Sequence, residues 1–174
     1  MLIDSFMETE IKRLATELVE LLRSKGYTFA TAESCTGGAI ASAVTRVPGC
    51  SDVMLGGVVA YHNNVKQAML GVSDDALCKY GAVSEAVVRE MVCGVSQRLG
   101  ADCAVATSGV AGPGGGTPDK PVGTVWVAVK VADRVVTRLL QLQDKGREAN
   151  IENTVCEVLR MVLEVNGWRL TVSD

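Results

Sequence analysis

The chain has 174 residues, of which 48% are hydrophobic, and its 17 Lys and Arg against 20 Asp and Glu give a net charge of −3. This composition excludes an intrinsically disordered chain, and the acidic balance disfavours extended binding to nucleic acid, which needs a basic surface. No apolar run reaches the roughly 18 residues of a membrane-spanning helix, and the first residues do not resemble a signal peptide. We therefore expect a single soluble, cytoplasmic domain over residues 1–174 that binds neither nucleic acid nor membranes.

The periodicity of apolar residues predicts most of the elements. From Ile11 to Leu22 apolar residues recur at helical spacing, and Gly26 then provides a stop. Alternating β-branched and aromatic residues predict the strands in the same way. In chain order, the predicted elements are a helix at 8–25, a strand at 27–32, a helix at 39–45, a strand at 52–61, helices at 65–70 and 84–99, strands at 102–108, 122–131 and 134–142, and a helix at 151–165.

Strands that alternate with helices predict an α/β fold. The last two strands are separated only by the short turn Ala132-Asp133, so we expect them to pair as an antiparallel hairpin. The earlier strands are separated by helices, which is typical of parallel pairing. The sequence therefore predicts a three-layer α/β/α sandwich with a mixed, mostly parallel sheet.

The six cysteines indicate neither a disulfide framework nor a metal centre. They stand at positions 35, 50, 78, 93, 103 and 156, without a Cys-x-x-Cys pair, and several lie in apolar stretches. His62 is the only histidine, so the usual Cys/His spacing of a zinc site is missing. We expect reduced core thiols and no metal or other cofactor.

Ser34 is the first candidate for chemistry. It stands in Thr31-Ala-Glu-Ser-Cys-Thr-Gly-Gly38, where a predicted strand ends and two glycines precede a helix. Free backbone N–H groups at a helix start can bind an anion or stabilise an oxyanion, which suits a nucleophilic serine. A serine that merely caps the helix is the structural alternative, and these residues alone leave both interpretations open.

A nucleophilic serine needs a base, and Lys66 is the candidate. His62 is followed by Asn63 and Asn64 rather than by a carboxylate, so no Ser/His/Asp set is available. Lys66 follows the second strand in an apolar context, and a desolvated lysine can take a hydroxyl proton if its pKa falls by about 3 units. A solvated surface lysine is the alternative.

Cys35, next to Ser34, is a rival nucleophile. The same helix start would stabilise its thiolate. The chain contains neither the glycine-flanked nucleophile elbow nor a Ser-x-x-Lys motif, so no familiar hydrolase signature decides between the two side chains.

The segment 109–123 is predicted to be an irregular loop because it holds six glycines and three prolines. It matches neither a Walker A motif nor Gly-x-Gly-x-x-Gly. Its N–H groups could form an anion site at the end of a buried strand, and Arg147 could pair with a phosphate there. The alternatives are a flexible surface loop and a solvent-exposed arginine.

Several segments taken together resemble one family. They are Ala32-Glu-Ser-Cys-Thr-Gly-Gly38, Leu55-Gly-Gly-Val-Val-Ala-Tyr61 with Lys66, Gly81-Ala-Val-Ser-Glu85, and Gly109-Val-Ala-Gly-Pro-Gly-Gly-Gly-Thr-Pro118 with Lys120-Pro-Val-Gly-Thr-Val125. From Thr9 to Leu163 the chain is similar to the C-terminal domain family of the competence/damage-inducible protein CinA, whose characterised enzymes are nicotinamide mononucleotide amidohydrolases. The resemblance implies a three-layer α/β/α fold and metal-free hydrolysis of the carboxamide of nicotinamide mononucleotide to nicotinic acid mononucleotide and ammonia.

The resemblance also implies the catalytic roles. Ser34 matches the nucleophile, Lys66 its general base, and Tyr61 a hydroxyl that assists proton transfer or orientation. Attack by the serine would give an oxyanion held by N–H groups from Thr36 to Gly38, and then an acyl-enzyme that water cleaves.

Substrate contacts are expected from Thr36, Gly37 and Gly38, and from three further residues. These three are Ser108, Gly109 and Arg147. Ser108 stands where the family usually has threonine, and Asp144-Lys-Gly-Arg147 replaces the usual Gly-Asp-Arg.

Larger family members carry an additional N-terminal domain that resembles molybdopterin-binding proteins. Because the resemblance covers nearly the whole of this chain, we expect the chain to be the stand-alone type. Homodimers or larger homo-oligomers are common in the family and are expected here. Two other functions stay open: a non-catalytic nucleotide-binding module, and an amidase that acts on another small carboxamide.

Overall fold

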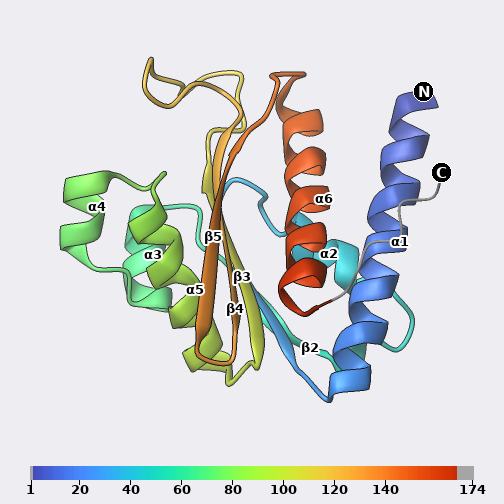
Figure 1. The fold of residues 1–174 in the computed structure, drawn as a ribbon. Coiled ribbons are helices and arrows are strands. Elements are labelled where there is room, and N and C mark those ends of the chain that lie inside the picture. Colours follow the sequence, from blue (N-terminus) through green and yellow to red (C-terminus); the bar gives the residue numbers. More distant parts are fainter. Residues whose placement is uncertain (1, 168–174) are drawn as a thin grey trace.

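The computed structural model describes residues 2–167 and is drawn in Figure 1. Within these residues the chain forms helices on both faces of one sheet. In chain order, the elements are α1 (Leu2–Lys25), β1 (Phe29–Glu33), α2 (Ala39–Thr45), the 3₁₀ helix η1 (Cys50–Asp52), β2 (Met54–Val59), α3 (Asn63–Leu70), α4 (Asp74–Tyr80), α5 (Glu85–Leu99), β3 (Cys103–Gly109), β4 (Thr124–Val131), β5 (Arg134–Gln141) and α6 (Arg147–Val165).

The sheet has the strand order β2-β1-β3-β4-β5. β1 pairs in parallel with β2 and β3, whereas β4 is antiparallel to both of its neighbours, β3 and β5. Four strands therefore point the same way and only β4 is reversed. The predicted hairpin across Ala132 and the predicted mixed, mostly parallel sheet are both confirmed.

Helix α4 was not predicted, because its signals are caps rather than apolar periodicity. The hydroxyl of Ser73 accepts a hydrogen bond from the N–H of Ala76 at the start of the helix, and Gly81 ends it. Seven residues are too few to show a clear helical repeat.

Two helices are longer than predicted. α1 begins at Leu2 rather than at residue 8, since no Gly or Pro interrupts the segment before the apolar stripe. α6 begins at Arg147 rather than at residue 151, because its first turn is polar and carries no apolar repeat. That polar turn lies at the site described below.

Helices cover both faces of the sheet in three layers (Figure 1). α1, α2 and α6 lie on one face, and α5 with α3 and α4 lies on the other. The sheet face toward α5 is lined largely by buried alanines, namely Ala30, Ala32, Ala104, Ala106 and Ala128. These short side chains let the valines and Met91 of α5 pack close to the strands.

α3 packs against α5 at a glycine. A Cβ atom on Gly94 would lie 1.9 Å from the carbonyl oxygen of Leu70, the last residue of α3. No side chain larger than hydrogen fits without moving one of the helices. This close approach fixes the position of α3, the helix that carries Lys66.

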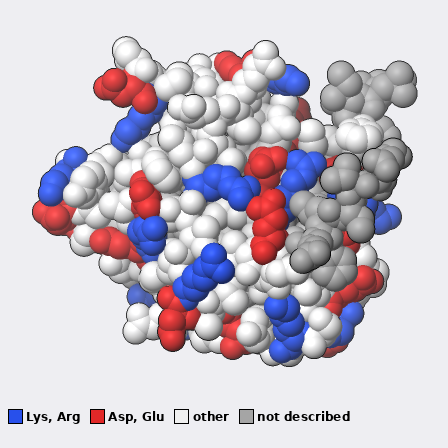
Figure 2. Space-filling view, viewed as in Figure 1, with Lys and Arg blue, Asp and Glu red and all other residues white. Residues whose placement is uncertain are grey.

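The surface visible in Figure 2 mixes acidic and basic side chains without a continuous basic area. No helix among the described residues is long and apolar enough to cross a membrane. All six cysteines are free, and only Cys35, Cys103 and Cys156 are buried, so the prediction of core thiols holds for three of the six.

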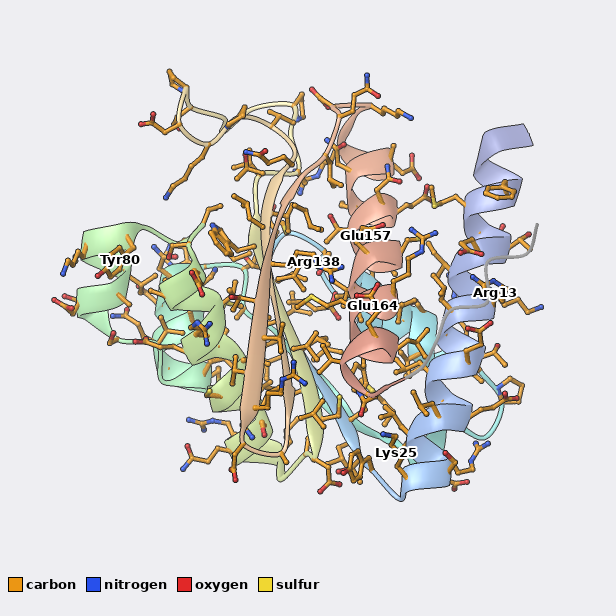
Figure 3. All side chains as sticks on the ribbon, viewed as in Figure 1. Arg13, Lys25, Tyr80, Arg138, Glu157 and Glu164 are labelled. Atoms are coloured by element: carbon orange, nitrogen blue, oxygen red, sulfur yellow. The ribbon has the colours of Figure 1, made fainter. Side chains whose placement is uncertain are left out.

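Polar contacts join the last helix to its neighbours (Figure 3). Arg138 on β5 forms an ion pair of 2.7 Å with Glu164 on α6. Lys25, at the end of α1, donates a hydrogen bond of 2.6 Å to the carbonyl oxygen of Asn166, just after α6. The first and last helices are thereby held together across the sheet face.

The loops that carry the predicted site meet at one edge of the sheet. β1 and β3 are parallel, with Glu33 opposite Thr107, so the loops that follow them emerge side by side. α3 and α6 begin at the same edge. Carboxyl ends of parallel strands commonly line the binding clefts of open α/β sheets.

Candidate active site

The structure brings Ser34 and Lys66 together. Ser34 directly follows β1, and its Oγ lies 3.1 Å from Nζ of Lys66 on α3. The Ser34 N–H donates to the carbonyl oxygen of Thr107 at 3.0 Å, which fixes the serine to the neighbouring strand β3. The two residues are 32 positions apart in the sequence and meet only because α3 packs beneath this edge.

Lys66 is a buried lysine, with a relative exposure of 1%, so the alternative of a solvated surface lysine is excluded. Burial lowers the pKa of Lys66 below the ordinary 10.5, because the charged form loses its hydration. Its Nζ also donates to the carbonyl oxygens of Ala60 at 2.8 Å and Tyr61 at 3.1 Å.

These three contacts are compatible with a neutral amine as well as with an ammonium group. A neutral Nζ has two N–H bonds and one lone pair. In the protonated form Nζ donates to Ser34 Oγ, whereas in the neutral form the two carbonyl oxygens accept from its N–H bonds and the lone pair can accept the Ser34 hydroxyl hydrogen. The arrangement can therefore take a proton from the serine.

The Glu33 carboxylate binds N–H groups at the start of α2. Its carboxylate is completely buried and accepts hydrogen bonds from the Thr36 hydroxyl at 2.7 Å and from the N–H groups of Gly38, Ile40 and Ala41 at 3.0, 3.1 and 2.9 Å. The negative charge lies at the positive end of the helix dipole. Gly38 is the N-cap residue, so Ser34 does not cap this helix.

This arrangement changes the expected oxyanion donors. The N–H of Gly37 donates to Ser34 O and the N–H of Gly38 donates to Glu33, so neither is available to a substrate. Thr36 uses its hydroxyl on Glu33 and Thr107. In the described part of the chain, the N–H groups of Cys35 and Thr36 have no carbonyl partner, and they are the donors that remain next to Ser34.

Cys35 is a poor nucleophile in this position. Its side chain is buried, and burial raises the pKa of the thiol to about 12. The thiolate is the reactive form of cysteine, so at neutral pH this thiol stays protonated and unreactive. The structure favours Ser34 over its neighbour.

A cavity of about 290 Å³ opens in front of Ser34 and Lys66. Besides these two, its lining includes Tyr61, Ser108, Gly109, the loop residues 110–112, 114 and 115, and Arg147. Thr36, Gly37 and Gly38 do not line it, in contrast to the expectation from the sequence. Ser108 donates its hydroxyl to the carbonyl oxygen of Ala82 at 2.8 Å, and this hydrogen bond joins two residues of the cavity wall.

Gly109 lies where no side chain fits. A Cβ atom there would lie 2.6 Å from Cγ2 of Val125 and 2.7 Å from the carbonyl oxygen of Thr124. The glycine therefore lets the start of the loop lie directly on β4, in the wall of the cavity.

Arg147 connects two walls of the cavity. One guanidinium nitrogen donates to the Gly112 carbonyl oxygen at 2.7 Å, and another donates to the Tyr61 hydroxyl at 2.8 Å. The arginine is exposed, yet it has defined partners. Within the described residues the Tyr61 hydroxyl makes no hydrogen bond to Ser34 or Lys66, and it is the Tyr61 carbonyl that contacts Lys66.

Sequence reasoning missed the roles of Glu33 and Asn150. Glu33 stands between a strand and a helix start, where a carboxylate can accept from helix N–H groups, and this was the available signal. Asn150 is buried in the first turn of α6 and donates to the carbonyl oxygen of Ala111. Nothing local in the sequence indicates that contact across 39 positions.

Comparison with known proteins identifies the family. Residues 11–166 match the model of the CinA C-terminal domain. The chain belongs to the CinA C-terminal domain family.

Curated relatives of this CinA-family chain are considerably longer. A CinA-like protein of Prochlorococcus marinus is 58% identical over 116 residues, which cover 67% of this chain and 27% of that protein. A CinA-like protein of Cytophaga hutchinsonii is 48% identical over 143 residues, which cover 82% of this chain and 34% of that protein. The chain thus spans about a third or less of their length.

Solved CinA structures share the fold. The crystal structure of competence/damage inducible protein CihA from Agrobacterium tumefaciens has a TM-score of 0.88 at 40% identity, covering 90% of this chain and 96% of that chain. A CinA superfamily protein from Escherichia coli has a TM-score of 0.87 at 33% identity, covering 90% and 91%. These likenesses agree with the predicted fold class.

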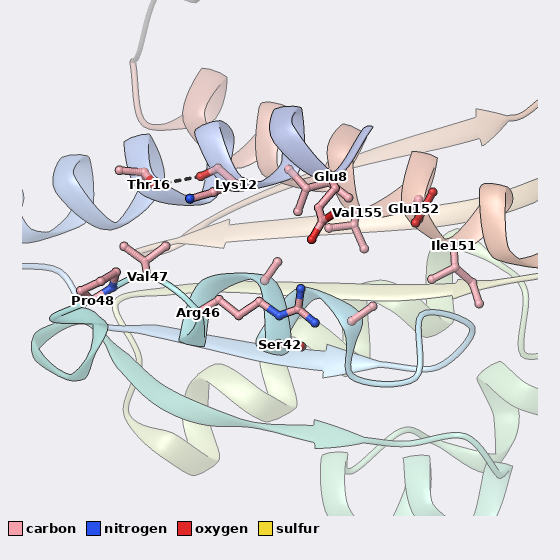
Figure 4. Close-up of a pocket in the computed structure, with 13 residues that line it drawn as sticks. Glu8, Lys12, Thr16, Ser42, Arg46, Val47, Pro48, Ile151, Glu152 and Val155 are labelled. Atoms are coloured by element: carbon pink, nitrogen blue, oxygen red, sulfur yellow. Dashed lines mark hydrogen bonds between the residues drawn. The ribbon is translucent and has the colours of Figure 1, made fainter. Parts of the chain in front are cut away.

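A larger cavity of this CinA-family domain lies away from Ser34, between α1, α2 and α6 (Figure 4). It measures about 540 Å³, and Arg46 extends along it beside Ser42. Its lining combines apolar side chains with scattered charges and includes none of the predicted site residues. Among the described residues, no group of three or more His, Cys, Asp or Glu could hold a metal ion at either cavity.

Proposed function

We propose that this CinA-family domain hydrolyses the carboxamide of nicotinamide mononucleotide and releases nicotinic acid mononucleotide and ammonia. The observation that carries the proposal is the buried Lys66 amine 3.1 Å from the Ser34 hydroxyl, with both of its remaining hydrogen-bonding directions taken by carbonyl oxygens. A lysine in this environment is suited to be the base of a Ser-Lys hydrolase.

The reaction would proceed through an acyl-enzyme. Ser34 Oγ bonds to the carboxamide carbon while Lys66 Nζ accepts the hydroxyl proton. The N–H group of Cys35, which lines the cavity next to Ser34, donates to the oxyanion of the tetrahedral intermediate. Lys66 returns the proton to the amide nitrogen, the C–N bond breaks, and ammonia leaves.

Water completes the cycle. Lys66 takes a proton from a water molecule, the hydroxide oxygen bonds to the acyl carbon, and the bond to Ser34 Oγ breaks as the proton returns to the serine. The product is the carboxylic acid, and no step needs a metal ion. Each lost oxyanion donor typically costs about 10²–10³ in rate.

The cavity favours a mononucleotide as the substrate. Its volume of about 290 Å³ suits a small ligand rather than a dinucleotide. Arg147 and the free N–H groups of the glycine-rich loop, which line the same cavity as Ser34, supply donors for a phosphate. The resemblance to nicotinamide mononucleotide amidohydrolases agrees with these features.

The test is ammonia release from nicotinamide mononucleotide by the purified protein in the presence of a chelator. We expect release that resists the chelator and falls at least about 10³-fold in Ser34→Ala. Ser42→Ala, an exposed serine on α2, is the matched control, and Cys35→Ala should stay within about tenfold of the parent because the thiol takes no part.

Each other result points to another function. Release by Ser34→Ala at the parent rate would refute the nucleophile. Absence of release by a folded protein that binds the nucleotide would indicate a non-catalytic binding module. Release from a different small carboxamide alone would indicate an amidase of other specificity.

A further inference from the structure

Asn150 holds the glycine-rich loop from the first turn of α6. Its side chain is buried, and Nδ2 donates to the carbonyl oxygen of Ala111 at 3.0 Å and to Oδ1 of Asp144 at 3.1 Å. Its Oδ1 accepts the N–H of Lys145 at 3.5 Å. Two acceptors therefore face the amide nitrogen and one donor faces the oxygen, which defines the orientation of the amide.

The same helical turn holds the next carbonyl group of the loop. Arg147 donates to the carbonyl oxygen of Gly112, so two successive loop carbonyls, those of Ala111 and Gly112, are hydrogen bonded to α6. Both residues line the cavity. The loop conformation beside the proposed phosphate position thus depends on two side chains of one helix.

Peptide geometry sets the direction of the Gly112 N–H. The bond between Ala111 and Gly112 is trans, and in a planar trans peptide the carbonyl group and the following N–H point in opposite directions. Because the Ala111 carbonyl points to Asn150, the Gly112 N–H points away from it. Among the described residues this N–H has no hydrogen-bond partner.

We propose that Asn150 is a positioning residue for substrate phosphate: by holding the Ala111 carbonyl, it directs the Gly112 N–H into the cavity, where it donates to the phosphate together with Arg147. The inference rests on the proposed function, because it concerns the phosphate end of the same substrate. Asp144 contributes by holding the Asn150 amide and the Gly146 N–H, at 2.9 Å, with one oxygen.

The charges around the loop agree with an anionic ligand. Arg147 and Lys66 are basic side chains of the cavity lining, and no Asp or Glu of the described residues belongs to it. The nearby Asp144 carboxylate already accepts two hydrogen bonds through Oδ1. A neutral donor such as Asn150 shapes the loop without placing a negative charge next to the phosphate.

The experiment replaces Asn150 by Asp, which keeps the size of the side chain but presents an oxygen to the Ala111 carbonyl and to Asp144. Binding is measured by calorimetry in a Ser34→Ala background, which prevents turnover. The probes are nicotinamide mononucleotide and nicotinamide riboside, the same molecule without its phosphate. Asn153→Asp, an equal charge change on α6 at a residue outside the cavity, is the matched control.

We expect Asn150→Asp to weaken binding of the mononucleotide at least tenfold, and binding of the riboside less than twofold. Asn153→Asp should change neither by more than twofold. Equal weakening of both probes by Asn150→Asp would reduce Asn150 to a general structural role and overturn the proposal, and so would an unchanged affinity for the mononucleotide.

A second variant keeps the test valid if Asn150→Asp does not fold. Asp144→Ala changes an exposed residue and should weaken mononucleotide binding in the same selective way, by about threefold. Ammonia release by the parent reports separately on the proposed function. If the parent releases ammonia but the variants show no selective loss of mononucleotide binding, only the role of Asn150 is refuted. If the variants lose mononucleotide binding selectively but the parent releases no ammonia, only the hydrolysis is refuted. A parent that binds neither probe would refute both proposals.

Discussion

The central residue of the site is a lysine whose surroundings disfavour its charge. Lys66 is buried and lies beside a hydroxyl and two carbonyl oxygens, and no carboxylate of residues 2–167 is among its hydrogen-bond partners. Burial is the main reason that its pKa falls below 10.5. A lower pKa means that more of the amine is neutral at physiological pH, and only the neutral amine can take the serine proton.

Turnover in the proposed reaction should therefore depend on the protonation of Lys66. Below the pKa of Lys66 the amine is protonated and the rate should fall about tenfold per pH unit, whereas above it the rate should level off. The midpoint of the rate profile should lie below 10.5. Lys66→Met should lower turnover by about 10²–10⁴-fold, whereas Lys79→Met, at an exposed lysine on α4, should not.

Measurement of kcat against pH for the parent and both variants checks this expectation. A profile without an inflection below pH 10.5, or a Lys66→Met protein with parental turnover, would contradict the assignment of the base.

Some of these features of single residues could be predicted from the sequence. The position of Ser34 after a strand and that of Lys66 in an apolar stretch could be read locally. The choice between a capping and a nucleophilic serine could not, because it depended on Glu33 occupying the helix start. The inertness of Cys35 likewise depends on burial that only the packed core creates.

At the scale of elements, the close packing of α3 against α5 holds Lys66 at hydrogen-bonding distance from Ser34. The contact of Gly94 with the Leu70 carbonyl leaves no space for a methyl group. In an exposed helix, replacing Gly by Ala usually stabilises by about 1 kcal/mol. Here the steric conflict should reverse that sign.

Gly94→Ala should lower the free energy of unfolding by about 1–3 kcal/mol, since overpacking displaces α3 from α5. It should also lower turnover in the proposed reaction at least about tenfold, because Lys66 moves with α3. Urea unfolding and steady-state kinetics measure the two effects. Cys93→Ala, at the exposed neighbouring position on α5, controls for the helix; a stabilised and fully active Gly94→Ala protein would refute the close-packing argument.

At the scale of the whole molecule, the two ends of the described chain are joined by side chains of α1 and α6. Glu10 accepts hydrogen bonds from Arg13 on its own helix at 2.8 and 2.9 Å and from Arg160 on α6 at 3.0 Å. The bonds from Arg13, supported by Arg160, lower the pKa of Glu10 from 4.5 to about 2. The carboxylate thus contributes to the packing of the first helix against the last.

The stabilisation by Glu10 should depend on pH. A carboxylate whose folded-state pKa is depressed stabilises the fold fully above its unfolded value, near 4.5, and loses this contribution as the pH falls through about 2. Glu10→Gln should therefore lower the free energy of unfolding by about 1–2 kcal/mol at pH 7 and by much less near pH 2.

Urea titrations of the parent, Glu10→Gln and Glu20→Gln at both pH values measure this effect. Glu20 is an exposed residue of the same helix and serves as the control. A Glu10→Gln penalty that is equal at pH 7 and pH 2 would show that the ion pairs do not contribute in this way.

The sequence by itself determined most of the elements and the class of fold. Apolar spacing and glycine stops are local signals, and the alternation of strands and helices restricts the sheet to few topologies. Local signals also located Ser34, Lys66, the glycine-rich loop and Arg147. The tertiary structure decided which of these residues meet, and which N–H groups remain free after Glu33 has taken those of α2. It alone joined Asn150 to the loop and desolvated Lys66, since burial and contact between distant segments exist only once the helices pack on the sheet.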